Sequence, residues 1–204
     1  MVQLFLDGGG FMWPILAIGA IGLIFVGERL YHLITGLQAN EDFSIEVSHI
    51  VESDGYNSAM QKCEQVPGPI SNLCFNALEK ASGGVEEAEK ALEQTAGIEM
   101  ATLEKNMTWI SLCIATAPML GFLGTVWGMI QAFNDIKMAN DISPAIVAGG
   151  ISVALLTTAF GLVIAVILQI LQNTVLYIID NQIVTMQRAT THLLGAIKSR
   201  SSKR

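Results

Sequence analysis

Residues 107–133, MTWISLCIATAPMLGFLGTVWGMIQAF, contain no Asp, Glu, Lys, Arg or His, and the same holds for residues 142–179. A helix needs roughly 20 mostly apolar residues to cross about 30 Å of hydrocarbon, so both stretches are long enough. A third uncharged stretch covers residues 11–27. The three stretches predict an all-α polytopic membrane protein with three transmembrane helices that extend into the cytoplasm.

The overall composition agrees with this fold class. Of the 204 residues, 51% are hydrophobic and only 14% are charged, which is too apolar for an ordinary soluble domain. Residues 1–10 hold no Lys or Arg, so a retained helix is favoured over a cleaved secretory signal, which has a basic leader. Most acids behind the net charge of −7 lie between Glu41 and Glu104, as on solvated helix faces, and imply no nucleic-acid partner.

The distribution of positive charge predicts the orientation, because Lys and Arg favour the cytoplasmic side. No such residue precedes the first span, Arg29 closes it, and four lie within residues 198–204. We therefore expect a multi-pass membrane protein, in contact with lipids, with its N-terminus on the outer side and its C-terminus in the cytoplasm. The predicted segments are a periplasmic N-terminus (1–10), transmembrane helix 1 (11–36), a cytoplasmic helical region (37–105), transmembrane helix 2 (106–133), a periplasmic loop (134–143), transmembrane helix 3 with a cytoplasmic extension (144–179), and a cytoplasmic C-terminal helix with a basic tail (180–204).

The region between the first two spans is too long for a simple loop and is expected to form helices. Asp54-Gly55 and residues 67–69, Pro-Gly-Pro, are the predicted breaks. After Gly83-Gly84, apolar residues recur at helical spacing. We expect that helix to continue through Lys105 into the second span as one rod, and residues 198–204 to form a solvated basic end near anionic headgroups.

Neither the cysteines nor the histidines form a recognisable metal or redox motif. Cys63, Cys74 and Cys113 make no CxxC pair, and the first two fall in the predicted reducing cytoplasm, so unpaired core thiols are expected. The three histidines lack metal-ligand spacing, and no GxxxxGK[ST] phosphate loop occurs. The chain is therefore not expected to be an enzyme or to bind a metal or cofactor.

Small residues recur at helical intervals in the second and third spans. They fall on four lines: Ala117, Gly121 and Thr125; Gly124 and Gly128; Gly150, Ala154 and Thr158; and Thr157, Gly161 and Ala165. Such lines let helix backbones approach closely, and packing alone would explain the glycines. A membrane threonine, in turn, often bonds back to its own helix.

The depth of Thr125 and Thr158 favours a second role beside packing. Both hydroxyls are predicted to face one another at middle depth, where a passing ion needs oxygen ligands. Neither span contains an ionisable side chain of the kind that normally relays protons in membranes. If this chain conducts protons, another polypeptide must supply the carboxylate, which indicates a heteromeric channel.

Two segments resemble a known family. Residues 117–129, APMLGFLGTVWGM, and residues 150–162, GISVALLTTAFGL, resemble the paired signature of the MotA/TolQ/ExbB family, closest to its ExbB/TolQ branch. The resemblance implies a homo-pentamer around a dimer of single-span ExbD/TolR-like partners, each with a membrane aspartate, and possibly a TonB-like protein. It also implies that Thr125 and Thr158 occupy the positions of the family's pore threonines, with Thr157 beside them in the ion pathway.

Two departures from the family pattern bear on the transported ion. Val153 stands where ExbB and TolQ members commonly have a glutamate, and the doublet Thr157-Thr158 replaces the usual Ala-Thr. The doublet is more similar to sodium-driven flagellar stators. H⁺ is the expected ion, with Na⁺ as the alternative.

Three other functions are weighed against this one. A MotA/PomA-like flagellar stator usually has four spans, and a solute transporter usually shows internal repeats, which this chain lacks. A non-conducting membrane assembly scaffold would use the small-residue lines for packing only. The expected function is an ion-channel subunit of an ExbB–ExbD/TolQ–TolR-like motor that converts the ion gradient into mechanical work on a periplasmic or outer-membrane partner.

Overall fold

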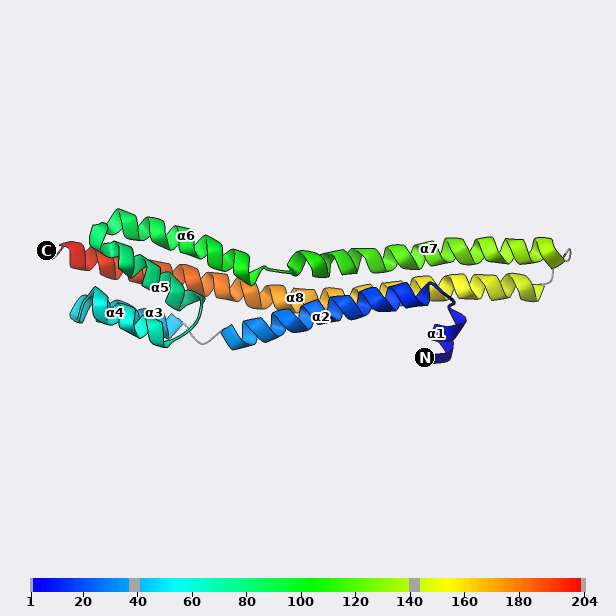
Figure 1. Ribbon diagram of the computed structural model, residues 1–204, viewed down its shortest axis with the longest axis horizontal. Helices are drawn as coiled ribbons and strands as arrows, with labels where there is room; N and C mark the ends of the chain where they lie inside the picture. Colours follow the sequence, from blue (N-terminus) through cyan, green and yellow to red (C-terminus); the bar gives the residue numbers. More distant parts are fainter. Residues whose placement is uncertain (1, 37–40, 140–143, 203–204) are drawn as a thin grey trace. The chain divides into compact units, whose positions relative to one another are not determined.

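The computed structural model describes residues 2–36, 41–139 and 144–202, and every regular element in these ranges is helical (Figure 1). The elements are α1 (Val2–Asp7), α2 (Met12–Gly36), α3 (Glu41–Ser53), α4 (Tyr56–Gln65), α5 (Pro69–Lys80), the 3₁₀ turn η1 (Ala81–Gly83), α6 (Val85–Leu103), α7 (Met107–Ala139) and α8 (Pro144–Ser202). Three helical stretches are long and apolar enough to cross a membrane, by length and composition. The structure confirms the predicted all-α class, with three helices that are candidates to span a membrane.

The helices form two compact units, each described by itself. The first unit comprises Met1–Arg29 and Asn106–Val175, and the second comprises Leu30–Lys105 and Leu176–Arg204. The three charge-free stretches belong mainly to the first unit.

In the first unit, α2 and the first part of α8 run parallel to each other, and α7 runs antiparallel to α8 (Figure 1). Glycines set the approach of α2. A Cβ at Gly19 would lie 3.1 Å from Ile164, and one at Gly22 would lie 2.6 Å from Leu168 and 3.3 Å from Cys113. The absence of a side chain at these two positions therefore lets α2 contact both other helices.

The boundary between α6 and α7 corrects one expectation. The predicted single rod through Lys105 does not form, because α6 ends at Leu103 and α7 begins at Met107. Asn106 has φ 66°, the left-handed conformation that Asn tolerates better than most residues. The left-handed backbone at Asn106 breaks the helix without the Gly or Pro that usually marks such a position.

The Asn106 side chain joins a polar cluster at the end of the first unit's part of α2. Its Nδ2 donates to Glu28 Oε2 at 2.7 Å, and Arg29 Nη2 pairs with Glu28 Oε1 at 2.6 Å. Arg29 is only 4% exposed. A guanidinium this buried needs a carboxylate at close range, which Glu28 supplies.

In the second unit, α3, α4, α5 and α6 pack around an apolar core. The chain reverses at glycines with positive φ: Gly55 (99°) before α4, Gly68 (152°) before α5 and Gly84 (125°) before α6. Pro69 then occupies the first turn of α5, where its fixed φ suits a helix start. The reversals at Gly55 and Gly68 fall at the two predicted breaks, and Gly84 precedes the helix predicted to follow it.

The C-terminal part of α8 differs from the predicted solvated basic end. Arg200 Nη1 donates to the carbonyl oxygens of Val51 and Glu52, and its guanidinium lies 5.6 Å from the centre of the Tyr56 ring. The last carbonyls of a helix have no partner within it and carry partial negative charge. Arg200 therefore caps α3, whereas Lys203 and Arg204 lie outside the described residues.

We expect Arg200→Met to lower the stability of the second unit by about 1–2 kcal/mol, because it removes both the cap and the cation–π contact. Hydrogen exchange on the purified full chain would show faster exchange at the end of α3 and the start of α4. Lys198→Met, on the exposed side of the same helix, is the control and should leave that exchange unchanged. Equal protection in the two variants would contradict the capping role.

Two further boundaries differ from the predicted segments. Helix α7 continues to Ala139, past the predicted end of the second span at 133, and the remainder of the predicted loop, 140–143, lies outside the described residues. Helix α8 is continuous from Pro144 to Ser202, so no break separates the predicted extension from the C-terminal helix. A helix needs no apolar side chains to continue, so a helix can extend beyond the apolar stretch that predicts a span.

Candidate functional site

The contact between α7 and α8 is made of small residues. A Cβ at Gly121 would lie 2.9 Å from the Thr157 carbonyl oxygen, and one at Gly161 would lie 2.6 Å from the Ala117 carbonyl oxygen. At Gly128 the nearest atom would be the Ala154 Cβ, at 3.2 Å. Backbone meets backbone at the first two positions, so no flexible side chain could move aside for a larger residue.

The structure brings the residues predicted for packing into this one contact. They are Ala117, Gly121, Gly124 and Gly128 on α7, and Gly150, Ala154 and Gly161 on α8. On α8 the buried line steps from Ala154 to Thr157 to Gly161, so it alternates intervals of three and four. The sequence analysis placed Ala154 and Thr157 on separate lines, because it followed intervals of four only.

Thr157 lies inside this contact. Its side chain is 1% exposed, and a Cβ at Gly124 would lie 2.6 Å from the Thr157 hydroxyl oxygen. The hydroxyl lies 2.7 Å from the Ala154 carbonyl oxygen and 3.3 Å from the Gly121 carbonyl oxygen. Thr157 therefore serves the α7–α8 contact, where its hydroxyl is bonded to backbone.

Thr158 and Thr125 are half-buried beside the same contact. Thr158 Oγ1 donates across the helix pair to the Gly121 carbonyl oxygen at 3.0 Å, and Thr125 Oγ1 donates within α7 to the Phe122 carbonyl oxygen at 2.6 Å. The two acceptors are consecutive carbonyls of α7. Both hydroxyls thus donate to backbone carbonyl oxygens, and each hydroxyl oxygen keeps lone pairs that can accept from a donor or bind a cation. Their place in an ion pathway stays a prediction.

A polar bridge between α7 and α8 was not anticipated. Gln172 is 7% exposed, and its Nε2 donates to Ser111 Oγ at 2.6 Å. A buried amide in an apolar helix pair needs such a partner. Both residues occur in charge-free stretches, so the sequence offered no signal that would have paired them.

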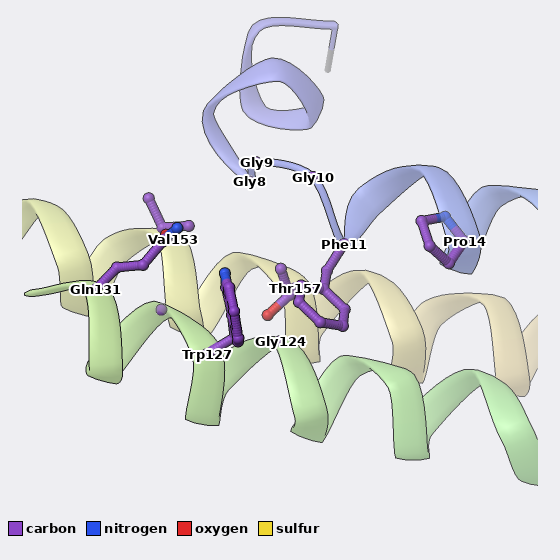
Figure 2. Close-up of a pocket in the computed structure, with 11 residues that line it drawn as sticks. Gly8, Gly9, Gly10, Phe11, Pro14, Gly124, Trp127, Gln131, Val153 and Thr157 are labelled. Atoms are coloured by element: carbon purple, nitrogen blue, oxygen red, sulfur yellow. The ribbon is translucent and has the colours of Figure 1, made fainter.

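A pocket of about 330 Å³ opens where the α1–α2 connection faces α7 and α8 (Figure 2). Its walls combine three glycines, apolar side chains and a few polar groups: Gly8, Gly9, Gly10, Phe11, Pro14, Gly124, Trp127, Gly128, Gln131, Val153 and Thr157. The Phe11 and Trp127 ring centres are 6.2 Å apart. Figure 2 shows Gln131 beside Val153 on facing helices.

A second pocket, of about 440 Å³, shares Gly128, Gln131 and Val153 with the first and adds Asp135. Val153 is the position at which a family glutamate was expected. Asp135, on α7, is the acidic residue in the lining of this second pocket. The sequence analysis missed Asp135 because it placed residue 135 in a loop.

The chemistry available at this site is that of hydroxyls, backbone carbonyls, side-chain amides and, in the second pocket, the Asp135 carboxylate. Among the residues that the structure describes, no group of three His, Cys, Asp or Glu side chains is placed to hold a metal ion. Oxygen atoms of this kind accept hydrogen bonds and can share a hard cation with water.

Comparison with known proteins places these helices in a family. Residues 65–188 match the MotA/TolQ/ExbB proton channel family. This region holds α5, α6 and α7 entire and the part of α8 that contains the threonines and glycines described above.

Proteins of similar sequence support the same family assignment. The chain is 32% identical over 184 residues to a protein of Methanothermobacter thermautotrophicus named as a homolog of the biopolymer transport protein ExbB, covering 90% of this chain and 65% of the relative. It is 30% identical over 132 residues to the biopolymer transport protein ExbB of Neisseria gonorrhoeae, covering 58% of this chain and 60% of the relative. The chain thus spans somewhat under two thirds of the length of these relatives. With more than half of its residues matched, the chain belongs to the MotA/TolQ/ExbB proton channel family.

Proposed function

We propose that this chain is the channel-forming subunit of an ion-driven membrane motor of the ExbB type, and that Thr125 and Thr158 line its ion path. The observation that carries the proposal is the state of these two hydroxyls. Each is half-buried in a segment without ionisable side chains, and each donates its hydroxyl hydrogen bond to a backbone carbonyl oxygen.

This hydrogen bonding favours a particular kind of partner. A hydroxyl that already donates its one hydrogen bond can still accept a hydrogen bond, but it cannot donate another. A protonated carboxylic acid offers a donor to such an oxygen, whereas a carboxylate offers only acceptors and is costly to hold in a low-dielectric site. A membrane aspartate of a single-span partner would therefore dock on Thr125 and Thr158 when protonated and leave when ionised.

The assembly we propose is a homo-pentamer around a dimer of ExbD/TolR-like partners in the inner membrane, with the N-terminus periplasmic. Protonation cycles of the two aspartates would turn the partner dimer, and its periplasmic part would act on a TonB-like or outer-membrane protein. This chain supplies the passage and the hydroxyls and catalyses no bond-making step.

The ion in this proposal is H⁺ rather than Na⁺. The sodium alternative rested on two neighbouring hydroxyls, those of Thr157 and Thr158. Thr157 is 1% exposed and packs against Gly124, so its oxygen is engaged inside the helix pair. One half-buried hydroxyl on α8 gives a sodium ion few ligands, whereas it suffices for one hydrogen bond to an acid.

Thr158→Val tests the proposal, because valine nearly preserves the shape and removes the hydroxyl. We expect normal membrane assembly and a loss of motor-driven growth or transport of about tenfold or more, the effect of one hydrogen bond worth ~1.4 kcal/mol. The chain is co-expressed with its single-span partner, and sodium and the pH gradient are varied separately.

Two variants serve as controls for this experiment. Thr158→Ser keeps the hydroxyl and should keep activity, and Thr191→Val removes another α8 hydroxyl, bonded to the Gln187 carbonyl at 3.0 Å, and should change nothing. Full activity of assembled Thr158→Val would favour a non-conducting scaffold. Activity that follows sodium instead of the pH gradient would favour the sodium alternative.

A further inference from the structure

The two pockets of the first unit adjoin each other. The pocket of about 330 Å³ and the pocket of about 440 Å³ have Gly128, Gln131 and Val153 in both of their linings. The described residues Thr125 and Thr158 line neither pocket. The joined space therefore does not include the two hydroxyls proposed for the ion path, and its own lining has to indicate what it holds.

The first pocket presents two aromatic rings. The ring centres of Phe11 and Trp127 are 6.2 Å apart and the ring planes are inclined by 52°. Figure 2 shows Trp127 and Val153 on the side of α7 and α8 that faces residues 8–10. Aromatic faces attract apolar groups and, because they carry partial negative charge, cations as well.

The second pocket adds a charge. Asp135 lies eight residues after Trp127 on α7, which is about 12 Å along a helix at 1.5 Å per residue. Gln131 lies halfway between them and lines both pockets, and its amide oxygen can accept a hydrogen bond. Within the described part of the chain, no Lys, Arg or His lines either pocket. The lining is thus complementary to a positive group and offers no counter-charge to a negative one.

Room for a ligand remains beside this lining. A Cβ built at Gly10, in the first pocket, or at Gly149, in the second, would meet no atom within 4 Å among the described residues. The two volumes also fall in the range of pockets that hold small molecules, about 300–1,000 Å³.

We propose that the two pockets together bind an amphipathic organic cation, with its apolar body on Phe11 and Trp127 and its ammonium group near Asp135. The ligand would be a soluble amine rather than a phospholipid with an ammonium head group. A phospholipid also carries a phosphate, for which this lining provides no positive partner, so that its negative charge would lie near the Asp135 carboxylate.

Three probes that share a phenylbutyl body test the proposal: 4-phenylbutylamine, the cation; 4-phenylbutanol, which is neutral; and 4-phenylbutyrate, the anion. Each is titrated calorimetrically into the purified full chain in maltoside micelles, and titration into empty micelles corrects for partition. We expect the amine to bind about threefold to fivefold more tightly than the alcohol, the effect of one exposed ion pair, and the butyrate to bind most weakly. Equal affinities for the three probes would overturn the proposal.

Variants assign the preference to the two ends of the site. Asp135→Asn should lower the affinity for the amine to that for the alcohol and leave the alcohol unchanged. Asp7→Asn is the matched control, because Asp7 is another exposed carboxylate of the first unit and lines neither pocket. Trp127→Leu should weaken the amine and the alcohol together, by about fivefold. An equal loss of preference in Asp7→Asn would show a general surface-charge effect and overturn the site.

Two further measurements set the limits of the proposal. Phosphatidylethanolamine added to the micelles should not displace the amine, and displacement by it but not by phosphatidylglycerol would overturn the choice of a soluble amine over a lipid. Thr158→Val should bind the amine as the unchanged chain does. Weaker binding by that variant would contradict the separation of this site from the proposed ion path.

Discussion

Gly161→Val is expected to separate α7 from α8 and to lower stability by about 3 kcal/mol, at the upper end of the cost of overpacking. A Cβ at this position would lie 2.6 Å from the Ala117 carbonyl oxygen and 3.2 Å from the Gly121 Cα. Both neighbours are backbone atoms in helices, so relief requires movement of a whole helix. Thermal unfolding of the purified chain in detergent micelles measures the loss.

Gly149→Val is the matched control, in the same helix. No atom lies within 4 Å of a Cβ built at Gly149 among the described residues. The two variants share the same change in helix propensity, which therefore cancels in the comparison. Similar unfolding temperatures for both variants would show that α7 and α8 do not depend on close contact at Gly161.

Glu28→Gln has the second large expected effect, a loss of about 2–3 kcal/mol at neutral pH. The substitution removes the negative charge that faces the Arg29 guanidinium at 2.6 Å, and Arg29 is 4% exposed. Removal of one member of a buried ion pair costs more than the pair contributes, because the remaining charge stays in a poor environment. Since the Glu28 side chain is 35% exposed, water compensates for part of the loss.

A double variant distinguishes the ion pair from other effects of residue 28. Glu28→Gln combined with Arg29→Met removes both charges, and we expect it to recover much of the lost stability. Chemical denaturation of the single and double variants in the same micelles makes the comparison. A double variant less stable than Glu28→Gln would show that Arg29 contributes chiefly through other contacts.

The spans were predictable because a membrane imposes a simple rule on sequence. Long charge-free stretches identified α2, α7 and the first part of α8, and Asp54-Gly55 and the Pro-Gly-Pro of residues 67–69 identified the reversals before α4 and α5. The break at Asn106 was missed, because a single left-handed residue leaves no compositional mark. The end of α7 at Ala139 was missed because charged residues can continue a helix that has left the apolar region.

At the candidate site, residue types were predictable and their partners were not. The spacing of the small residues indicated close packing, but only the geometry shows that Thr157 packs inside the helix pair while Thr158 lies beside it. Glycines near the N-terminus carry no chemical signal, so the pocket at Gly8–Gly10 could not be anticipated.

The left-handed backbone at Asn106 also restricts how this protein can diverge. Glycine would adopt φ 66° without strain but would lose the bond to Glu28. Aspartate would tolerate the conformation but would bring a second negative charge to the Glu28 carboxylate, and β-branched residues would be strained. Position 106 therefore accepts very few alternatives, and we expect its substitutions to co-vary with residue 28 across related sequences.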